Sequence, residues 1–217
     1  MAEAAPFQRF RTILMFGAPG SGKGTQGKVL GTIPRFHHMA CGDVFRSLDT
    51  RTPLGQEFVE YSSRGQLVPD ETTVKLWRAS IHDKVKTRQF KPDIDFLVLD
   101  GIPRNVEQAK FMETDIDVLQ VFHLSCPDRA ELSRRLRKRA LKENRFDDAN
   151  DEVIQRRIRL YEEESKPILD YYSQGIYAGR NIVTDIDAGN APMKVVHRIL
   201  SRIMELEAWK LVESLKV

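Results

Sequence analysis

Short apolar runs alternate along the chain with longer segments in which apolar residues recur every three or four positions. The short runs predict strands, and the longer segments predict amphipathic helices. Several of these runs are almost continuously apolar, which is typical of strands covered on both faces. The expected strands are Thr12–Phe16, Phe36–Ala40, Phe96–Leu99, Leu119–Leu124 and Asn181–Ile186. Their alternation with helices predicts an α/β fold with a parallel five-stranded sheet flanked by helices.

Local signals place the ends of several helices. Asp70 is the expected N-cap of one helix, and Ser125–Asp128 is expected to begin another. Pro167 is expected to interrupt a third, longer helix, because proline cannot continue the backbone hydrogen bonding. The three expected apolar stripes are Val74, Trp77, Ile81 and Val85; Ile154, Ile158, Tyr161, Ile168 and Tyr172; and, after Pro192, Val196, Ile199, Ile203 and Leu206.

Composition narrows the class of protein. Of the 217 residues, 41% are apolar and 30% are charged, which excludes a disordered tail and a low-complexity linker. Lys and Arg number 34 against 31 Asp and Glu, so the net charge of +3 requires neither a nucleic acid nor a membrane surface as a partner.

Cysteine usage and apolar run lengths indicate the compartment. Cys41 and Cys126 are too few for a disulfide scaffold and too far apart for a zinc motif, so we expect reduced thiols. Every apolar run is far shorter than the ~20 residues of a membrane helix. Arg9 and Arg11 are not followed by the long apolar stretch of a secretory signal. We therefore expect a soluble cytoplasmic protein.

A glycine-rich segment, Gly17–Thr25, directly follows the first expected strand and begins a helix. Its backbone N–H groups and the positive end of the helix form an anion site, to which Lys23 adds a full charge. This context predicts a P-loop that binds nucleotide phosphates. Gly24 follows the lysine where most P-loops have Ser or Thr, and the hydroxyl comes one residue later, at Thr25. The chain also lacks an NKxD motif, so we do not expect a regulatory GTPase.

The sequence resembles the adenylate kinase family and, more broadly, the nucleoside monophosphate (NMP) kinases. The P-loop matches that family's G-x-P-G-x-G-K-G-T pattern, and further motifs follow in the family's order between about residues 12 and 190. These further motifs are Cys41–Arg46, Gly65–Val68, Asp100–Arg104, Arg135–Arg139 and Arg145–Asp148.

The resemblance implies a P-loop NTPase-type core over residues 1–217 as a single kinase domain. Residues 42–90 would form a helical NMP-binding insertion, and residues 139–148 would form a short lid. Only five residues separate Arg139 from Arg145, and none is a cysteine, so structural zinc is not expected. Asp147 and Asp148 are expected to hold the closed lid, with loop capping as the alternative.

The implied reaction is reversible transfer of the γ-phosphoryl group of Mg-ATP to AMP, which gives two ADP molecules. This is a transferase reaction of nucleotide biosynthesis, carried out by an expected monomer on ATP and AMP with Mg²⁺ as cofactor. Asp100 would order water around the metal. The implied catalytic residues are Lys23, Arg104, Arg139, Arg145 and Arg157.

The resemblance also implies the residues that bind each nucleotide. The adenine of ATP is expected near residues 187–190. The implied ATP-binding residues are Gly20, Ser21, Gly22, Lys23, Gly24, Thr25, Arg135, Arg139 and Asn190. The implied AMP-binding residues are Cys41, Arg46, Gln66, Leu67, Val68, Gly101, Ile102, Pro103, Arg104, Gln108, Arg145 and Arg157. Among these, Arg104 would bind the AMP phosphate and Gln108 would meet the base.

Residues 134–145 carry a dense run of basic side chains. Arg135 and Arg139 are four residues apart and lie on one helical face, while Arg134 and Lys138 form a neighbouring stripe. We expect the first pair to face ATP and the second to face mainly solvent.

Two alternatives remain open at the level of sequence. A UMP/CMP kinase is one, because Cys41 replaces the usual threonine of adenylate kinases and Asn105 also occurs in pyrimidine-preferring relatives. A nucleotide-gated RNA-binding protein is the other, with residues 134–145 as its contact surface. It would bind RNA with a steep salt dependence.

Overall fold

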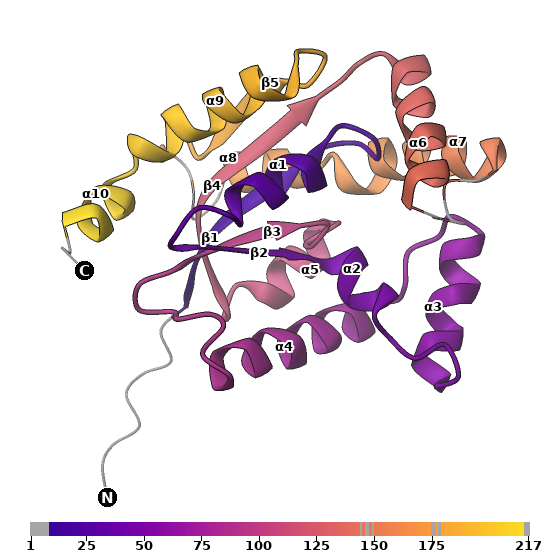
Figure 1. Cartoon of the computed structure of the whole chain (residues 1–217), viewed down its shortest axis with the longest axis horizontal. Helices are drawn as coiled ribbons and strands as arrows, with labels where there is room; N and C mark the ends of the chain where they lie inside the picture. Colours follow the sequence, from indigo (N-terminus) through magenta and orange to yellow (C-terminus); the bar gives the residue numbers. More distant parts are fainter. Residues whose placement is uncertain are drawn as a thin grey trace, which may run out of the picture.

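The computed structural model describes residues 9–143, 145, 148, 150–174, 177 and 179–214. Its centre is a five-stranded sheet in the order β2-β3-β1-β4-β5, in which all neighbours are parallel. The strands are β1 (Phe10–Phe16), β2 (Phe36–Ala40), β3 (Phe96–Asp100), β4 (Ile116–Ser125) and β5 (Val183–Asp187) (Figure 1). The predicted α/β fold and all five predicted strands are confirmed, although β1 and β4 begin earlier than expected, at Phe10 and Ile116, and β5 begins later, at Val183.

Ten α-helices and one π-helix are found in the described part of the chain. They are α1 (Lys23–Leu30), α2 (Cys41–Arg46), α3 (Pro53–Ser63), α4 (Asp70–Lys86), α5 (Val106–Met112), α6 (Arg129–Glu143), α7 (Asp151–Leu160), η2 (Tyr161–Ser165), α8 (Ile168–Ser173), α9 (Pro192–Met204) and α10 (Glu207–Ser214).

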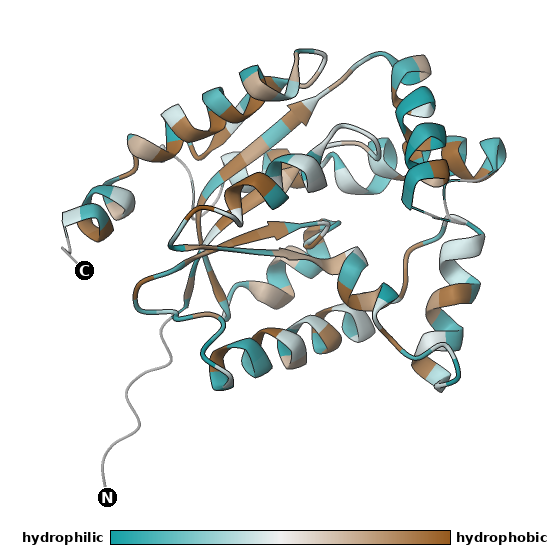
Figure 2. Cartoon of the chain, in the orientation of Figure 1, coloured by the Kyte–Doolittle hydropathy of each residue, from teal (hydrophilic) through white to brown (hydrophobic). Residues whose placement is uncertain are grey.

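The sheet separates two apolar layers, because alternate residues of each strand point to opposite faces. On β1, Leu14 packs into the layer that contains α4, α5 and α8, whereas Ile13 packs into the layer that contains α1, α9 and α10. These helices cover the two faces of the sheet in Figure 1. In Figure 2 the central strands are mostly brown, while α6, which stands away from the sheet, is mostly teal.

The predicted N-cap of α4 is wrong. Pro69 occupies the cap position, and Asp70 is the first residue of the helix. The Asp70 carboxylate instead accepts hydrogen bonds from the side-chain amides of Asn105 and Gln108. The side chain of Asp70, which the local sequence predicted to cap α4, is therefore held by two amide donors from the start of α5.

The apolar stripe predicted for the C-terminal segment is confirmed at Ile199 and Ile203 and differs at its two ends. Val195, Ile199 and Ile203 are the buried residues of α9, while Val196 is only partly buried and Leu206 follows the end of the helix. The buried residues are spaced by four, which keeps them on one face of a 3.6-residue helix. The position of the face is set by the sheet beneath it.

The expected interruption at Pro167 is confirmed. Helix α7 ends at Leu160, the π-turn η2 follows, and α8 begins after the proline. The wide turn is closed by a 2.8 Å hydrogen bond from the Lys166 N–H to the Tyr161 carbonyl. This break lies next to the cavity described below.

The last helix packs on the body of the protein. The Trp209 ring of α10 stacks on Phe36, with ring centroids 5.3 Å apart, and lies 6.0 Å from the Phe96 ring. Val212 is buried, whereas Leu211 is exposed. Helix α10 therefore covers the β2–β3 side of the sheet.

Candidate active site

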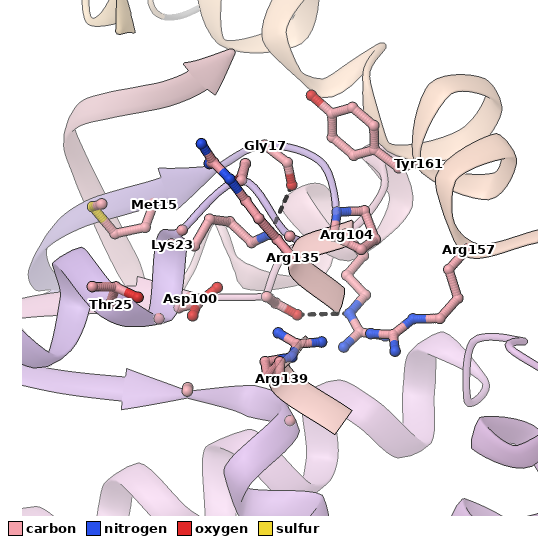
Figure 3. A pocket seen from close by; sticks show the side chains of 18 of the residues that line it. Met15, Gly17, Lys23, Thr25, Asp100, Arg104, Arg135, Arg139, Arg157 and Tyr161 are labelled. Carbon is pink, nitrogen blue, oxygen red and sulfur yellow. Dashed lines mark hydrogen bonds between the residues drawn. The ribbon is translucent and has the colours of Figure 1, made fainter. Parts of the chain in front are cut away.

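A cavity of about 1050 Å³ opens at the carboxyl ends of the central strands. Parallel α/β sheets bind ligands at this edge, because the loops that follow the strands converge there. The P-loop forms one wall, residues of α2, α3 and the following loop form a second, and α6 and α7 form a third. Figure 3 shows the side chains of Lys23, Arg104, Arg139 and Arg157 directed into the same space.

The P-loop needs glycine where its backbone turns. Gly22 has a φ of +100° at the N-cap of α1, a conformation that side chains with a Cβ rarely adopt. Gly17 has a φ of +142°, and a Cβ there would lie 2.5 Å from the Leu124 carbonyl oxygen. The loop is thus pressed against the end of β4, and its residues from Gly20 to Thr25 line the cavity.

Lys23 is folded back into this loop. Its Nζ donates to the carbonyl oxygens of Gly17 (2.8 Å) and Ala18 (3.1 Å). Burial lowers the pKa of Lys23 from 10.5 to about 8, and the positive charges of Arg139, Arg104 and Arg157 act in the same direction, while Asp100 opposes them. Positive charges that lie close together disfavour one another. The site is therefore suited to a ligand that carries several negative charges.

Asp100 is the last residue of β3 and faces the start of α1. A Cβ placed on Gly24 would lie 3.4 Å from the Asp100 Oδ2 atom. Within the described ranges, no group of three or more His, Cys, Asp or Glu side chains could enclose a metal ion. A single carboxylate near a phosphate loop fits Mg²⁺, which keeps several waters and binds mainly to substrate phosphates.

A fully buried carboxylate holds two of the arginines. Asp148 is 0% exposed, and its two oxygens lie 2.5 Å from Arg139 and 2.5 Å from Arg157. This pairing joins the end of α6 to α7 and fixes both guanidinium groups at the cavity wall. Asp147, the other aspartate expected in the lid, lies outside the described residues.

Arg145, which follows α6, lies close to α2. Its Nε donates to Glu143 at 2.8 Å, and one terminal nitrogen lies 3.7 Å from Asp43 of α2. Asp43 is also paired with Arg46, and these arginines hold the pKa of the Asp43 carboxyl below its usual range despite partial burial. Arg145 and Asp43, which both line the cavity, therefore bring the segment after α6 close to α2.

The face of α6 that points to the loop after β5 carries Arg135. Its guanidinium bonds Glu131 at 2.7 Å and the Ala188 carbonyl at 2.9 Å. Asn190 in the same loop donates to Asp187 at 2.8 Å. The predicted difference between the two basic stripes is visible in exposure, since the side chain of Arg135 is 28% exposed and that of Arg134 is 65% exposed. Arg134 and Lys138 nevertheless also line the cavity.

The insertion forms a lobe of the cavity with an aromatic wall. Phe45 of α2 and Phe58 of α3 are stacked with ring centroids 5.2 Å apart, and both line the cavity together with Val68. Arg46 lies at one side of this lobe. On the sheet side, the Arg104 Nε donates to the Gly101 carbonyl at 2.9 Å.

The cavity brings together most of the residues expected to bind nucleotide. Those that line it are Gly20, Ser21, Gly22, Lys23, Gly24, Thr25, Arg46, Gln66, Leu67, Val68, Asp100, Gly101, Pro103, Arg104, Gln108, Arg135, Arg139, Arg145, Arg157 and Asn190.

Two expected contacts, Cys41 and Ile102, lie behind the wall. Each is flanked by neighbours that line the cavity, and each is 2% exposed and packed in the apolar layer. The reason is local geometry, since side chains of adjacent residues point in different directions where a strand ends. Burial raises the pKa of the Cys41 thiol to about 11.

Sequence reasoning missed several residues of the wall. Phe45, Phe58, Thr73 and Tyr161 are four examples, and of them the sequence placed only Tyr161, on an apolar helix face. Phe45 lies within the matched segment 41–46, which was the one available signal. For Phe58, Thr73 and Tyr161, only the folded structure, which brings distant segments together, shows that they line the cavity.

Tyr161, the first residue of the π-turn, is tied to the sheet. Its hydroxyl lies 2.8 Å from His123 Nε2 on β4, and His123 Nδ1 lies 2.5 Å from Asp185 on β5. Burial, together with the negative charges of Asp185 and Glu162, raises the pKa of Tyr161. The phenol therefore stays protonated and anchors the break between α7 and α8.

Comparisons with known proteins agree with this geometry. A family model described as adenylate kinase matches residues 15–177. The chain is 34% identical over 206 residues to an adenylate kinase of Cyanothece sp., covering 92% of this chain and 98% of that protein. It is 32% identical over 195 residues to an adenylate kinase of Thermus thermophilus, covering 87% and 95% of the two chains. With Bacteroides thetaiotaomicron adenylate kinase, the identity is 36% over 166 residues, which is 74% of this chain and 83% of the relative. Because the family model spans most of the chain, including the range that holds the P-loop and the arginines that meet in the cavity, the chain belongs to the adenylate kinase family.

Proposed function

We propose that this protein transfers the γ-phosphoryl group of ATP reversibly to AMP and so forms two ADP molecules. The observation that carries the proposal is the convergence of Lys23, Arg104, Arg139 and Arg157 on one cavity, which is lined by the P-loop and α6 on one side and by α2, α3 and the following loop on another. Phosphoryl transfer requires little covalent help from a protein; it needs donor and acceptor in line and their charge neutralised.

ATP would occupy the lobe between the P-loop and α6. The P-loop N–H groups and Lys23 would bind its β- and γ-phosphates, and Lys23 would leave the Gly17 and Ala18 carbonyls to do so. Arg135, held beside the Ala188 carbonyl, would line the path of the triphosphate toward the loop after β5. The adenine would lie against that loop, near Asn190.

The transferred group would lie between the two arginines bound to Asp148. Arg139 and Arg157 present planar guanidinium groups, which bind phosphate oxygens two at a time and remain charged. Since the buried Asp148 fixes them before substrate binds, little reorganisation is needed when charge spreads over the phosphoryl oxygens. Arg145, in the proposed lid, would be a third arginine near the transferred phosphoryl group, on the side where AMP binds.

AMP would occupy the lobe of the insertion. Arg46 and Arg104 would hold its phosphate, and the base would enter the slot beside Phe45 and Val68. The two features that left a pyrimidine acceptor open do not touch this slot. Cys41 is buried behind the wall, and Asn105 uses its Oδ1 atom to cap α5 through the Gln108 N–H at 2.8 Å.

Magnesium fits this site as a partner of the substrate. When bound to ATP, it neutralises phosphate oxygens and supports the in-line arrangement. Asp100 would hold it through water at the end of β3, opposite Gly24. We propose no zinc, because the segment between Arg139 and Arg145 has no cysteine.

Residues 42–90 and 139–148 would close over the two nucleotides. The contact of Arg145 with Asp43 joins these two regions across the cavity. Closure would exclude water from the transferred group and prevent its hydrolysis. All the required groups come from one chain, so we propose an active monomer, and the two free thiols suit the cytoplasm.

The test is the rate of ADP formation from Mg-ATP with AMP, UMP or CMP as acceptor. We expect fast turnover with AMP and slow turnover with both pyrimidines. Preference for a pyrimidine would refute the choice of acceptor. ATP binding without turnover on any acceptor would refute the enzyme and favour a nucleotide-gated binding protein.

A further inference from the structure

A closed set of hydrogen bonds fixes one amide at the wall of the acceptor lobe. The Gln108 Oε1 atom accepts the backbone N–H of Arg104 at 2.8 Å. The Gln108 Nε2 atom donates to Asp70 Oδ1 at 2.6 Å. The Asn105 Nδ2 atom donates to both Asp70 oxygens, at 3.1 and 3.0 Å. Asp70 thus joins the start of α4 to the start of α5 through two amide groups.

These partners allow only one orientation of the Gln108 amide. A backbone N–H only donates, so the atom facing Arg104 must be the oxygen. An ionised carboxylate only accepts, so the atom facing Asp70 must be the nitrogen. Rotating the amide by half a turn would place two donors against each other at Arg104 and two acceptors against each other at Asp70.

The orientation matters because Gln108 is 1% exposed and lines the acceptor lobe. An amide nitrogen has two hydrogens, and Asp70 accepts one of them. The second hydrogen remains for an acceptor atom of a ligand. Buried polar groups discriminate strongly between ligands that pair with them and ligands that do not.

We propose that Asp70 is a positioning residue for base selection, which rests on the proposed function. By holding the Gln108 nitrogen toward α4, it presents a donor to the acceptor base. Adenine and cytosine have a ring lone pair at their pairing edge, whereas hypoxanthine, guanine and uracil have a ring N–H there. The site therefore accepts AMP and rejects IMP, which differs from AMP at that edge and scarcely in shape.

The first test needs only the wild-type protein. The rate constant kcat/KM is measured with AMP and with IMP as acceptors at saturating Mg-ATP. We expect a preference for AMP of about a hundredfold or more, since a mismatched buried donor faces the IMP N–H. Comparable use of the two acceptors would overturn the inference, while no turnover with AMP would instead refute the proposed function.

The second test changes the positioning residue. Asp70→Asn removes the partner that only accepts and leaves the Arg104 N–H as the one remaining group that orients the Gln108 amide, so the amide is held less firmly. We expect the AMP to IMP ratio of kcat/KM to fall about tenfold, with the KM for ATP unchanged. A uniform loss with both acceptors, at an unchanged ratio, would mean that Asp70 has only a structural role and would overturn the inference.

A matched control separates base selection from loosening of the helices. Asp115 also ties α4 to the α5 side, because it accepts from Arg78 at 2.7 and 2.9 Å, but it contacts neither Gln108 nor Asn105. Asp115→Asn should leave the AMP to IMP ratio unchanged. In a Gln108→Leu background, Asp70→Asn should cause no further change in that ratio, because the residue acts through the amide. A further change there would contradict the proposed route.

Discussion

Replacing Lys23 should abolish turnover and yet stabilise the protein without nucleotide. The folded site lowers the pKa of this lysine from 10.5 to about 8. Holding it charged at pH 7 therefore costs about 3 kcal/mol of folding free energy. Lys23→Met removes that cost, but it leaves the Gly17 and Ala18 carbonyls without their donor, at about 1 kcal/mol each. The net expectation is an increase of about 1 kcal/mol in the free energy of unfolding at pH 7.

The sign of this effect should reverse at high pH. Between pH 8 and 10.5 the unfolded chain binds the lysine proton and the folded chain does not, so wild-type stability rises with pH relative to the methionine variant. From pH 7 to 9.5 the relative gain is about 2 kcal/mol, which exceeds the advantage of the variant at pH 7.

The assay is urea unfolding of both proteins at pH 7, 8 and 9.5 without nucleotide, together with ADP formation at pH 7. Lys28→Met is the control for the substitution itself, because Lys28 is an exposed lysine of the same helix. The reasoning is refuted if Lys23→Met is less stable than wild type at pH 7 by an amount that does not change with pH. Retained turnover in that variant would refute the role of the lysine.

Four further substitutions test separate parts of the site and the fold. Arg104→Ala should raise the KM for AMP by more than about tenfold and the KM for ATP by less than about twofold, and equal effects in steady-state kinetics would place Arg104 elsewhere. Asp148→Asn should lower kcat and reduce the free energy of unfolding by about 2–4 kcal/mol, because two arginines lose a buried partner. Asp151→Asn, which breaks an exposed pair, should change that free energy by less than about 1 kcal/mol in the same urea titration. Trp209→Ala should destabilise the protein by about 2 kcal/mol and leave both KM values unchanged, whereas altered kinetics would show that α10 acts on the site.

Much of the fold could be predicted because its signals are local. The apolar runs of β1, β3 and β4 need no partner to be recognised as buried strands, and the glycine spacing of the P-loop dictates its own backbone. Pro167 interrupts its helix whatever surrounds it, since the missing N–H is a property of the residue. The position of the candidate site could also be predicted from the sequence, because residues 17–25 and 100–104 each lie at the end of a predicted strand.

The directions of individual side chains were decided by tertiary structure. Cys41 and Ile102 belong to the right segments but point into the apolar layer, while their immediate neighbours line the cavity. A motif gives the segment that reaches a ligand, but the rotation of the backbone at the strand end selects which residues of the segment face it.

Contacts between distant segments were likewise invisible along the chain. Asp70 was expected to cap its own helix, and it instead binds amides more than thirty residues away. Trp209 could be recognised as a packing residue, but its partners Phe36 and Phe96 are known only once α10 folds back over the sheet. The sequence by itself determined the strands, the phosphate loop and the chemistry of its cations, because these depend on neighbours in the chain. Tertiary structure alone decided which polar groups meet, because hydrogen bonds and burial depend on neighbours in space.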